Sequence, residues 1–185
     1  MSLEEEYLLM ADRLKENSHQ LDFTTQETLS LIDLTLLDQE ASDKELTKLC
    51  EKAKLSQVAA VCVLPKHLSK LAPLGDIKLA TVVNFPEGKQ DTEEIIEHIR
   101  ELIPLSKPNE IDYVFSYPSY LAGEKDKALQ QCHEIYQFCQ QQGMTFKVIL
   151  ETGALPSLEA IYQLSKEVLA GGCDFLKTST GKIIQ

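Results

Sequence analysis

The chain has 185 residues and a formal net charge of −11, and 43% of its residues are hydrophobic and 25% charged. These values are typical of one globular domain that is long enough to bury a full core. The acidic balance argues against nonspecific binding of nucleic acid or of an anionic membrane surface, because both favour a basic protein surface. A few lysines gathered in one place could still bind a small anion.

Targeting signals and cysteine usage point to one compartment. No apolar run approaches the ~20 residues of a membrane span, and the acidic N-terminus lacks the basic and apolar regions of a signal peptide. The five cysteines are odd in number and lie mostly within apolar patterns, which favours reduced, buried thiols. We therefore expect a cytoplasmic protein.

The N-terminal segment, residues 1–24, is predicted to be a helix and a loop that precede the main domain, residues 25–185. Apolar side chains recur on one side of an acidic helix over residues 3–17, and residues 18–25 are polar and indicate a loop. The helix is expected to be a solvated surface element. The alternative is that it covers the bottom of the main domain or contacts another subunit.

Strands and helices alternate along the main domain. Apolar segments predict strands in the middle of 28–36 and at 58–64, 77–85, 110–115, 145–150 and 173–176. Helical periodicity follows each of the first five strands, around 42–53, 67–71, 91–103, 128–139 and 158–168. Ser42 and Glu45 fit a capping box, and Asp91 can cap its helix. This alternation predicts an α/β fold with parallel strands and helices outside.

Functional groups of parallel α/β folds gather at the C-terminal ends of the strands. Polar residues interrupt or follow the apolar strands at Asp33, Thr35, Cys62, Asn84, Asp112, Lys147, Glu151 and Lys177. Charges inside buried strands are unfavourable unless they are paired, so Asp112, Lys147 and Lys177 are expected to form a compensating cluster. The alternative is an internal ion pair that only fixes strand packing.

Lys177 closes the last predicted strand and has two possible roles. It could extend into solvent, or it could lie partly desolvated beside a second cation, where its pKa would fall and the neutral amine would become a nucleophile. The following Thr178–Lys182 segment offers hydroxyls, a glycine and a lysine, which suit an anion such as phosphate. It is not a Walker A loop, because Leu176 and Ile183 stand where that motif needs other residues.

A neutral lysine that attacks an aldehyde gives a Schiff base, and a nearby carboxylate can move the protons. No metal is expected, because the four histidines show no ligand spacing. Six segments in this order resemble deoxyribose-phosphate aldolase: LIDLT (31–35), AAVCVLP (59–65), ATVVNFPEG (80–88), EIDYVFSYPSYLAG (110–123), FKVILETG (146–153) and DFLKTSTGK (174–182).

The resemblance implies a (β/α)8 TIM barrel and a cofactor-free class I aldolase. The implied reaction interconverts 2-deoxy-D-ribose 5-phosphate with D-glyceraldehyde 3-phosphate and acetaldehyde, in deoxyribonucleoside catabolism. Lys177 would be the Schiff-base nucleophile and Asp112 the proton-relay carboxylate. The implied substrate-binding residues are Lys147, Thr180, Gly181, Lys182, Cys62 and Asn84, of which Cys62 would have no required catalytic role.

The chain is shorter than the barrel that it resembles, since a (β/α)8 domain takes about 250 residues. We expect it to supply the first six β/α units, with exposed and associating edges at the first and sixth strands, and we expect the natural protein to continue past Gln185. The sequence leaves open whether the chain forms a homodimer. Two alternatives remain: another phosphate-binding barrel lyase or isomerase in which Lys177 only pairs charge, and a truncated, non-catalytic fragment.

Overall fold

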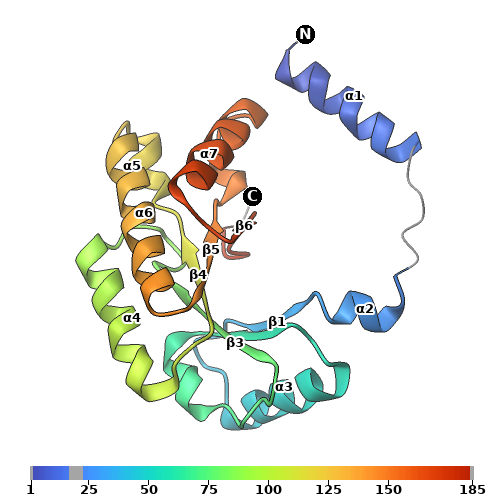
Figure 1. Cartoon of the computed structure of the whole chain (residues 1–185), viewed down its shortest axis with the longest axis vertical. Helices are drawn as coiled ribbons and strands as arrows, with labels where there is room; N and C mark the ends of the chain where they lie inside the picture. The colour runs from blue at the N-terminus through green and yellow to red at the C-terminus, as the bar shows by residue number, and fades with distance from the viewer. Residues whose placement is uncertain (1, 17–22, 184–185) are drawn as a thin grey trace.

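The computed structural model describes residues 2–16 and 23–183, and its centre is one curved sheet (Figure 1). The strands are β1 (Asp33–Leu36), β2 (Ala60–Val63), β3 (Lys78–Val83), β4 (Glu110–Val114), β5 (Thr145–Ile149) and β6 (Phe175–Lys177). Each strand pairs in parallel with the next one in sequence, in the order β1-β2-β3-β4-β5-β6. The sheet therefore curls into part of a (β/α) barrel, as the alternation of segments predicts.

Helices cover the outer face of this sheet (Figure 1). The helical elements are α1 (Leu3–Glu16), α2 (Thr25–Leu29), α3 (Asp43–Ser56), η1 (Pro65–Lys70), α4 (Thr92–Ser106), α5 (Tyr117–Leu121), α6 (Lys125–Gln141), η2 (Thr152–Ala154) and α7 (Leu158–Gly171). The capping box predicted at Ser42 and Glu45 is confirmed, and Asp91 caps α4 as expected. Within the described residues, no helix is both long and apolar enough to cross a membrane.

Alternation along β2 explains how the sheet is buried on both faces. Val61 and Val63 pack outward in a cluster with residues of α3, whereas Ala60 and Cys62 pack inward against Ala80 of β3. Neighbouring residues of a strand point to opposite faces, so a continuous apolar run is what a doubly covered strand requires. The inner face is lined here by small side chains, which leaves space inside the curve of the sheet.

The first strand begins later than its apolar run suggests. Residues 25–29 form the short helix α2, which the sequence interpretation did not foresee, and β1 starts only at Asp33. Thr24 and Glu27 make a complete capping box at the start of α2, and this local pairing favours a helix over the strand. Residues 18–22 of the predicted N-terminal loop, and residue 17 of the predicted helix, lie outside the described residues.

Two regions of the fold leave apolar side chains in solvent. Helix α1 lies beside α7 (Figure 1), yet Tyr7 and Met10 remain about half exposed in the groove between the two helices. At the open side of the sheet, Leu31 before β1 and Phe175 on β6 are 69% and 58% exposed. The five cysteines are free thiols, and Cys173 is the one that is not fully buried.

Candidate active site

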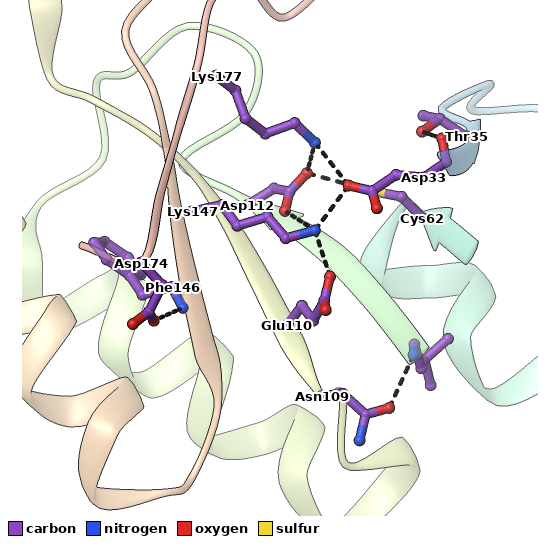
Figure 2. A network of polar contacts seen from close by, with 11 residues as sticks. Asp33, Thr35, Cys62, Asn109, Glu110, Asp112, Phe146, Lys147, Asp174 and Lys177 are labelled. Carbon is purple, nitrogen blue, oxygen red and sulfur yellow. Dashed lines mark hydrogen bonds and ion pairs between the residues drawn. The ribbon is translucent and has the colours of Figure 1, made fainter. Parts of the chain in front are cut away.

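Five charged side chains meet inside the curve of the sheet (Figure 2), and we call them the lysine cluster: Asp33, Glu110, Asp112, Lys147 and Lys177. They come from β1, β4, β5 and β6, which lie far apart in sequence. Strand register brings them together, because Asp112 is the partner of Lys147 across the β4–β5 pair. The predicted grouping of Asp112, Lys147 and Lys177 is therefore present in the structure.

Lys177 stands at the end of β6 with its side chain 30% exposed. Its Nζ donates a hydrogen bond to Asp112 Oδ2, and lies 3.4 Å from Asp33 Oδ2. Asp112 is 1% exposed, so its charge depends on the lysines for compensation. The amine is neither fully buried nor in bulk water, and a small molecule can approach it.

Lys147 occupies a deeper position, with its side chain 7% exposed. Its Nζ donates to Asp33 Oδ2 at 2.7 Å, forms an ion pair with Glu110, and lies 3.8 Å from Asp112 Oδ1. Three carboxylates thus surround this ammonium group. The Lys147 ammonium group therefore holds the carboxylates of the cluster together and is shielded from solvent.

The cluster holds one more carboxylate than ammonium group. Burial raises the pKa of Asp33, but the hydrogen bond and the charge of Lys147 outweigh burial and leave that pKa below its ordinary value. Burial likewise lowers the pKa of Lys147, and its contacts with Asp33 and Glu110 outweigh burial and raise the pKa well above the ordinary value. Asp112 Oδ1 has no hydrogen-bond partner in the described part of the chain.

The pKa of Lys177 does not follow the direction that we expected from the sequence. Burial lowers this pKa, but the charge of Asp112, its hydrogen bond and the charge of Asp33 together raise it above the ordinary value. A second cation was expected to lower it, and Lys147 does lie close by. The carboxylates outnumber the lysines, so their attraction exceeds the repulsion between the two ammonium groups.

Cys62 lies under the cluster on β2, with its Sγ 3.9 Å from Asp112 Oδ2. Burial, followed by the negative charge of Asp112, raises the pKa of this thiol far above its ordinary value. The protonated thiol is a weak donor to the carboxylate and a poor nucleophile. This placement fits the expectation that Cys62 lies near the site without carrying its chemistry.

A cleft of about 380 Å³ opens over the lysine cluster. Its charged and hydroxyl-bearing lining residues are Asp33, Thr35, Asp112, Lys177, Ser179 and Thr180. Asp33 and Thr35 face the same side of β1, as predicted from their spacing. A larger hollow of about 840 Å³ on the outer face of α4 is lined by several glutamates, and it lies away from both lysines.

The predicted anion-binding residues follow β6 directly. Thr180 is buried and lines the cleft, and its Oγ1 accepts a hydrogen bond from Lys182 N at 3.1 Å. Gly181 has a φ of +70°, which suits a residue without a side chain. The Lys182 side chain is exposed. The segment therefore forms an ordered turn at the rim of the cleft.

Asn84 does not join the lysine cluster. It follows β3 with a φ of +55°, and its Nδ2 donates to Val114 O at 2.8 Å and to Ser116 Oγ at 3.2 Å. Its Oδ1 accepts from Gln90 N at 2.8 Å. Both ends of the amide are engaged by neighbouring loops, so the structure gives this predicted substrate-binding residue a role in joining the β3 and β4 loops.

Asp33 and Glu110 are the cluster members to which the sequence interpretation gave no role. Asp33 interrupts an apolar run, and that signal was visible; its contact with Lys177 across the open side of the sheet depends on curvature that a sequence pattern does not encode. Glu110 stands at the start of β4, where a charge at a strand boundary is ordinary. Its contact with Lys147 follows only from the β4–β5 register.

Comparison with protein families matches residues 27–185 to the sequence model of DeoC/LacD family aldolases. The match covers the whole sheet and every member of the lysine cluster. It begins two residues after the predicted start of the main domain and leaves out helix α1.

Solved structures show the same fold. A protein assigned as a deoxyribose-phosphate aldolase from Coccidioides immitis is similar with a TM-score of 0.79 and 24% identity, over 100% of this chain and 75% of that one. The tetrameric deoxyribose phosphate aldolase from Aeropyrum pernix gives 0.80 and 23%, over 95% and 73%. An aldolase designated QR15 gives 0.77 and 27%, over 83% and 68%.

Proposed function

The chain belongs to the DeoC/LacD family of aldolases, and from this premise we propose that Lys177 forms a Schiff base with an aldehyde substrate. One observation carries the proposal: Lys177 lines the cleft, and its amine makes a hydrogen bond with the buried carboxylate of Asp112. A nucleophile beside a group that can take its proton is the arrangement that covalent catalysis needs.

The proposed substrate is 2-deoxy-D-ribose 5-phosphate, which would be cleaved to D-glyceraldehyde 3-phosphate and acetaldehyde. Lys177 would give up a proton to Asp112, attack the C1 aldehyde and lose water to form an iminium ion. Loss of the proton from the C3 hydroxyl would then break the C2–C3 bond and leave an enamine on Lys177. Protonation at C2 and hydrolysis would release acetaldehyde.

Asp112 would carry these protons through water. Its Oδ2 already contacts the amine, and its Oδ1 is buried without a hydrogen-bond partner in the described residues, so it can accept a proton or a bound water. The turn from Thr180 to Lys182 would hold the phosphate, in line with the phosphorylated sugar implied by the similar structures' names. No metal or organic cofactor takes part in this proposal.

The cellular role proposed with this reaction is deoxyribonucleoside catabolism in the cytoplasm. Self-association is proposed as well, in line with the tetramer described for the similar protein from Aeropyrum pernix. The exposed side chains at Leu31 and Phe175 are consistent with further contacts at the open side of the sheet.

Reductive trapping tests the proposal. Incubation with acetaldehyde and sodium borohydride should add one ethyl group to Lys177, and peptide mass spectrometry should find it there. Lys166→Met on the surface of α7 serves as the control and should leave the labelling unchanged. Absence of labelling, or labelling that spreads over surface lysines, would refute the Schiff base.

A second function is favoured by one observation, the raised pKa of Lys177. A lysine that stays protonated pairs charge and polarises a bound oxygen, as in a lyase or isomerase that binds a phosphorylated sugar without a covalent intermediate. That alternative predicts binding of deoxyribose 5-phosphate without trapping. The same borohydride experiment therefore separates the two functions.

A further inference from the structure

Glu151 is a buried carboxylate that the proposed chemistry does not use. It lies two residues after the end of β5, and the whole residue is 2% exposed. No lysine, arginine or histidine among the described residues forms an ion pair with it. A buried charge without a counter-ion is unfavourable, so this carboxylate needs another reason to be where it is.

The backbone of Glu151 is strained as well. Its φ and ψ are 52° and 60°, in the left-handed region that a residue with a side chain seldom adopts. Such a conformation persists where the surrounding structure imposes it, and it is commonest near functional sites. In this chain the residue lies where the segment after β5 makes hydrogen bonds with the segment after β6.

The side chain of Glu151 ends on the turn that follows Lys177. Its Oε2 accepts a hydrogen bond from Thr180 N at 2.8 Å, and Thr152 N donates to Thr178 O at 2.8 Å beside it. Thr180 Oγ1 in turn accepts from Lys182 N at 3.1 Å. Two backbone N–H groups of the turn are thereby satisfied within the protein.

These contacts leave other amides of the turn for a ligand. Thr178 N, Ser179 N and Gly181 N make no hydrogen bond to the described part of the chain, and Gly181 has a φ of +70°. Glu151 does not line the cleft, whereas Ser179 and Thr180 do. Any effect of Glu151 on a substrate must therefore pass through the turn.

We propose that Glu151 is a positioning residue that fixes the turn Thr178–Lys182 as the anion-binding end of the cleft. This inference rests on the proposed function for the identity of the anion, a sugar phosphate. It assigns the carboxylate a geometric role: a side chain of this length must reach Thr180 N from the left-handed turn after β5. Lys177 holds its own contacts with Asp112 and Asp33, so the amine should not depend on Glu151.

Two substitutions separate reach from charge. Glu151→Gln keeps the length and an oxygen that accepts from Thr180 N, but removes the charge. Glu151→Asp keeps the charge, but is one methylene too short. A geometric role predicts that Gln resembles the unaltered chain and that Asp resembles Glu151→Ala; an electrostatic role predicts the reverse.

Two readouts follow these variants in the full chain. Titration with inorganic phosphate, monitored by amide NMR shifts of Gly181, measures the turn. Trapping of acetaldehyde by sodium cyanoborohydride at Lys177 measures the amine without any phosphate. We expect Glu151→Ala and Glu151→Asp to weaken phosphate binding about tenfold while trapping stays within about twofold, and Glu151→Gln to bind phosphate nearly as the unaltered chain does.

The outcomes are distinct. Unchanged phosphate binding in Glu151→Ala, tight binding in Glu151→Asp with weak binding in Glu151→Gln, or no phosphate binding by the unaltered chain would each overturn the positioning role. An equal loss of trapping and phosphate binding would overturn it too, because it would indicate a general loss of structure. If trapping fails in the unaltered chain while the phosphate results hold, the Schiff-base function fails and the role of Glu151 stands.

Discussion

Two groups of buried polar side chains lie close to each other in this fold, and they differ in how completely their hydrogen bonds and charges are paired. The amide network, Asn84, Tyr113, Ser116 and Gln131, joins neutral groups whose hydrogen bonds close on one another. The lysine cluster has three carboxylates for two ammonium groups, and one oxygen of Asp112 has no hydrogen-bond partner within the described residues. A closed neutral network stabilises a fold, whereas an unbalanced charged cluster is typical of sites that move protons.

This contrast predicts that substitutions in the two groups will differ in their effect on the chemistry of Lys177. Changes in the amide network should lower the free energy of unfolding and leave the reactivity of Lys177 alone. Changes in the lysine cluster should alter that reactivity first.

Lys177→Met should abolish the trapping of acetaldehyde, with a loss of ~1,000-fold or more, because Lys177 lines the cleft and is 30% exposed, whereas the Lys147 side chain is 7% exposed among three carboxylates. The rate of ethyl incorporation, measured by mass spectrometry of the intact chain, gives this ratio. Lys166→Met on the exposed face of α7 is the matched control and should keep the trapping rate. Trapping that survives in Lys177→Met would place the nucleophile elsewhere.

Lys147→Met should lower the free energy of unfolding at pH 7 by about 3 kcal/mol, because it removes the ammonium group from between buried carboxylates. Lys147 keeps the pKa of Asp33 below its ordinary 3.8, and a lowered carboxylate pKa stabilises the fold above that value. That stability is lost as the pH falls through the folded-state pKa of Asp33. The difference between variant and parent should therefore shrink below about pH 4.

Urea unfolding of Lys147→Met at pH 7 and at pH 3.5 measures both effects. Lys78→Met, at the exposed start of β3, is the control and should change the unfolding free energy by less than about 0.5 kcal/mol. If Lys147 contributed only through the apolar part of its side chain, methionine would be tolerated at both pH values. That result would contradict the charged role of Lys147.

Asn84→Ala should lower the free energy of unfolding by about 2 kcal/mol, because Val114 O and Gln90 N lose their buried partner. Asn84→Gly loses the same hydrogen bonds but tolerates the φ of +55°, so it should be the more stable of the two variants. Both should trap acetaldehyde at the parental rate at temperatures where they are folded. Slower trapping in the folded Gly variant would tie the amide network to the chemistry.

The same contrast explains how much the sequence could predict. Apolar runs and helical periodicity placed the strands and the longer helices, because parallel strands buried on both faces leave continuous signals such as residues 58–64. The amino acids Asp112, Lys147 and Lys177 could be grouped, since charges inside such runs must compensate one another. Family resemblance then supplied the reaction.

Other features depend on geometry that a sequence pattern does not carry. The contact of Asp33 with Lys177 joins the two edges of the sheet, and only its curvature brings them within reach. In the sequence, Asn84 is a polar residue at the end of a strand, and an active-site residue would give the same pattern. Only the structure shows that its amide is engaged by hydrogen bonds to Val114 O and Gln90 N. The direction of the Lys177 pKa shift depends on how many carboxylates lie around its Nζ, and the sequence does not show that number.

Asp112→Asn should move the pH dependence of trapping to lower pH, with a small change in the rate near pH 7. Burial lowers the pKa of Lys177, and the charge of Asp112 is the largest contribution that raises it. Without that charge the pKa falls, so more of the amine is neutral near pH 7 and trapping by cyanoborohydride there should quicken. Cleavage of deoxyribose 5-phosphate should slow in the same variant, because asparagine cannot carry a proton.

The linkage of Lys177 to folding gives a second, independent check on Asp112→Asn. A lysine with a raised pKa contributes stability that is fully present below its ordinary 10.5 and is lost as the pH rises through the folded-state value. Asp112→Asn should remove this contribution, so the parent's stability should fall more steeply than the variant's at alkaline pH. Glu124→Gln, an exposed carboxylate on another loop, should change neither profile. A pH profile of trapping that stays in place or moves to higher pH in Asp112→Asn would mean that this carboxylate does not set the pKa of Lys177. The unbalanced charges of the lysine cluster would then not explain the reactivity of the amine.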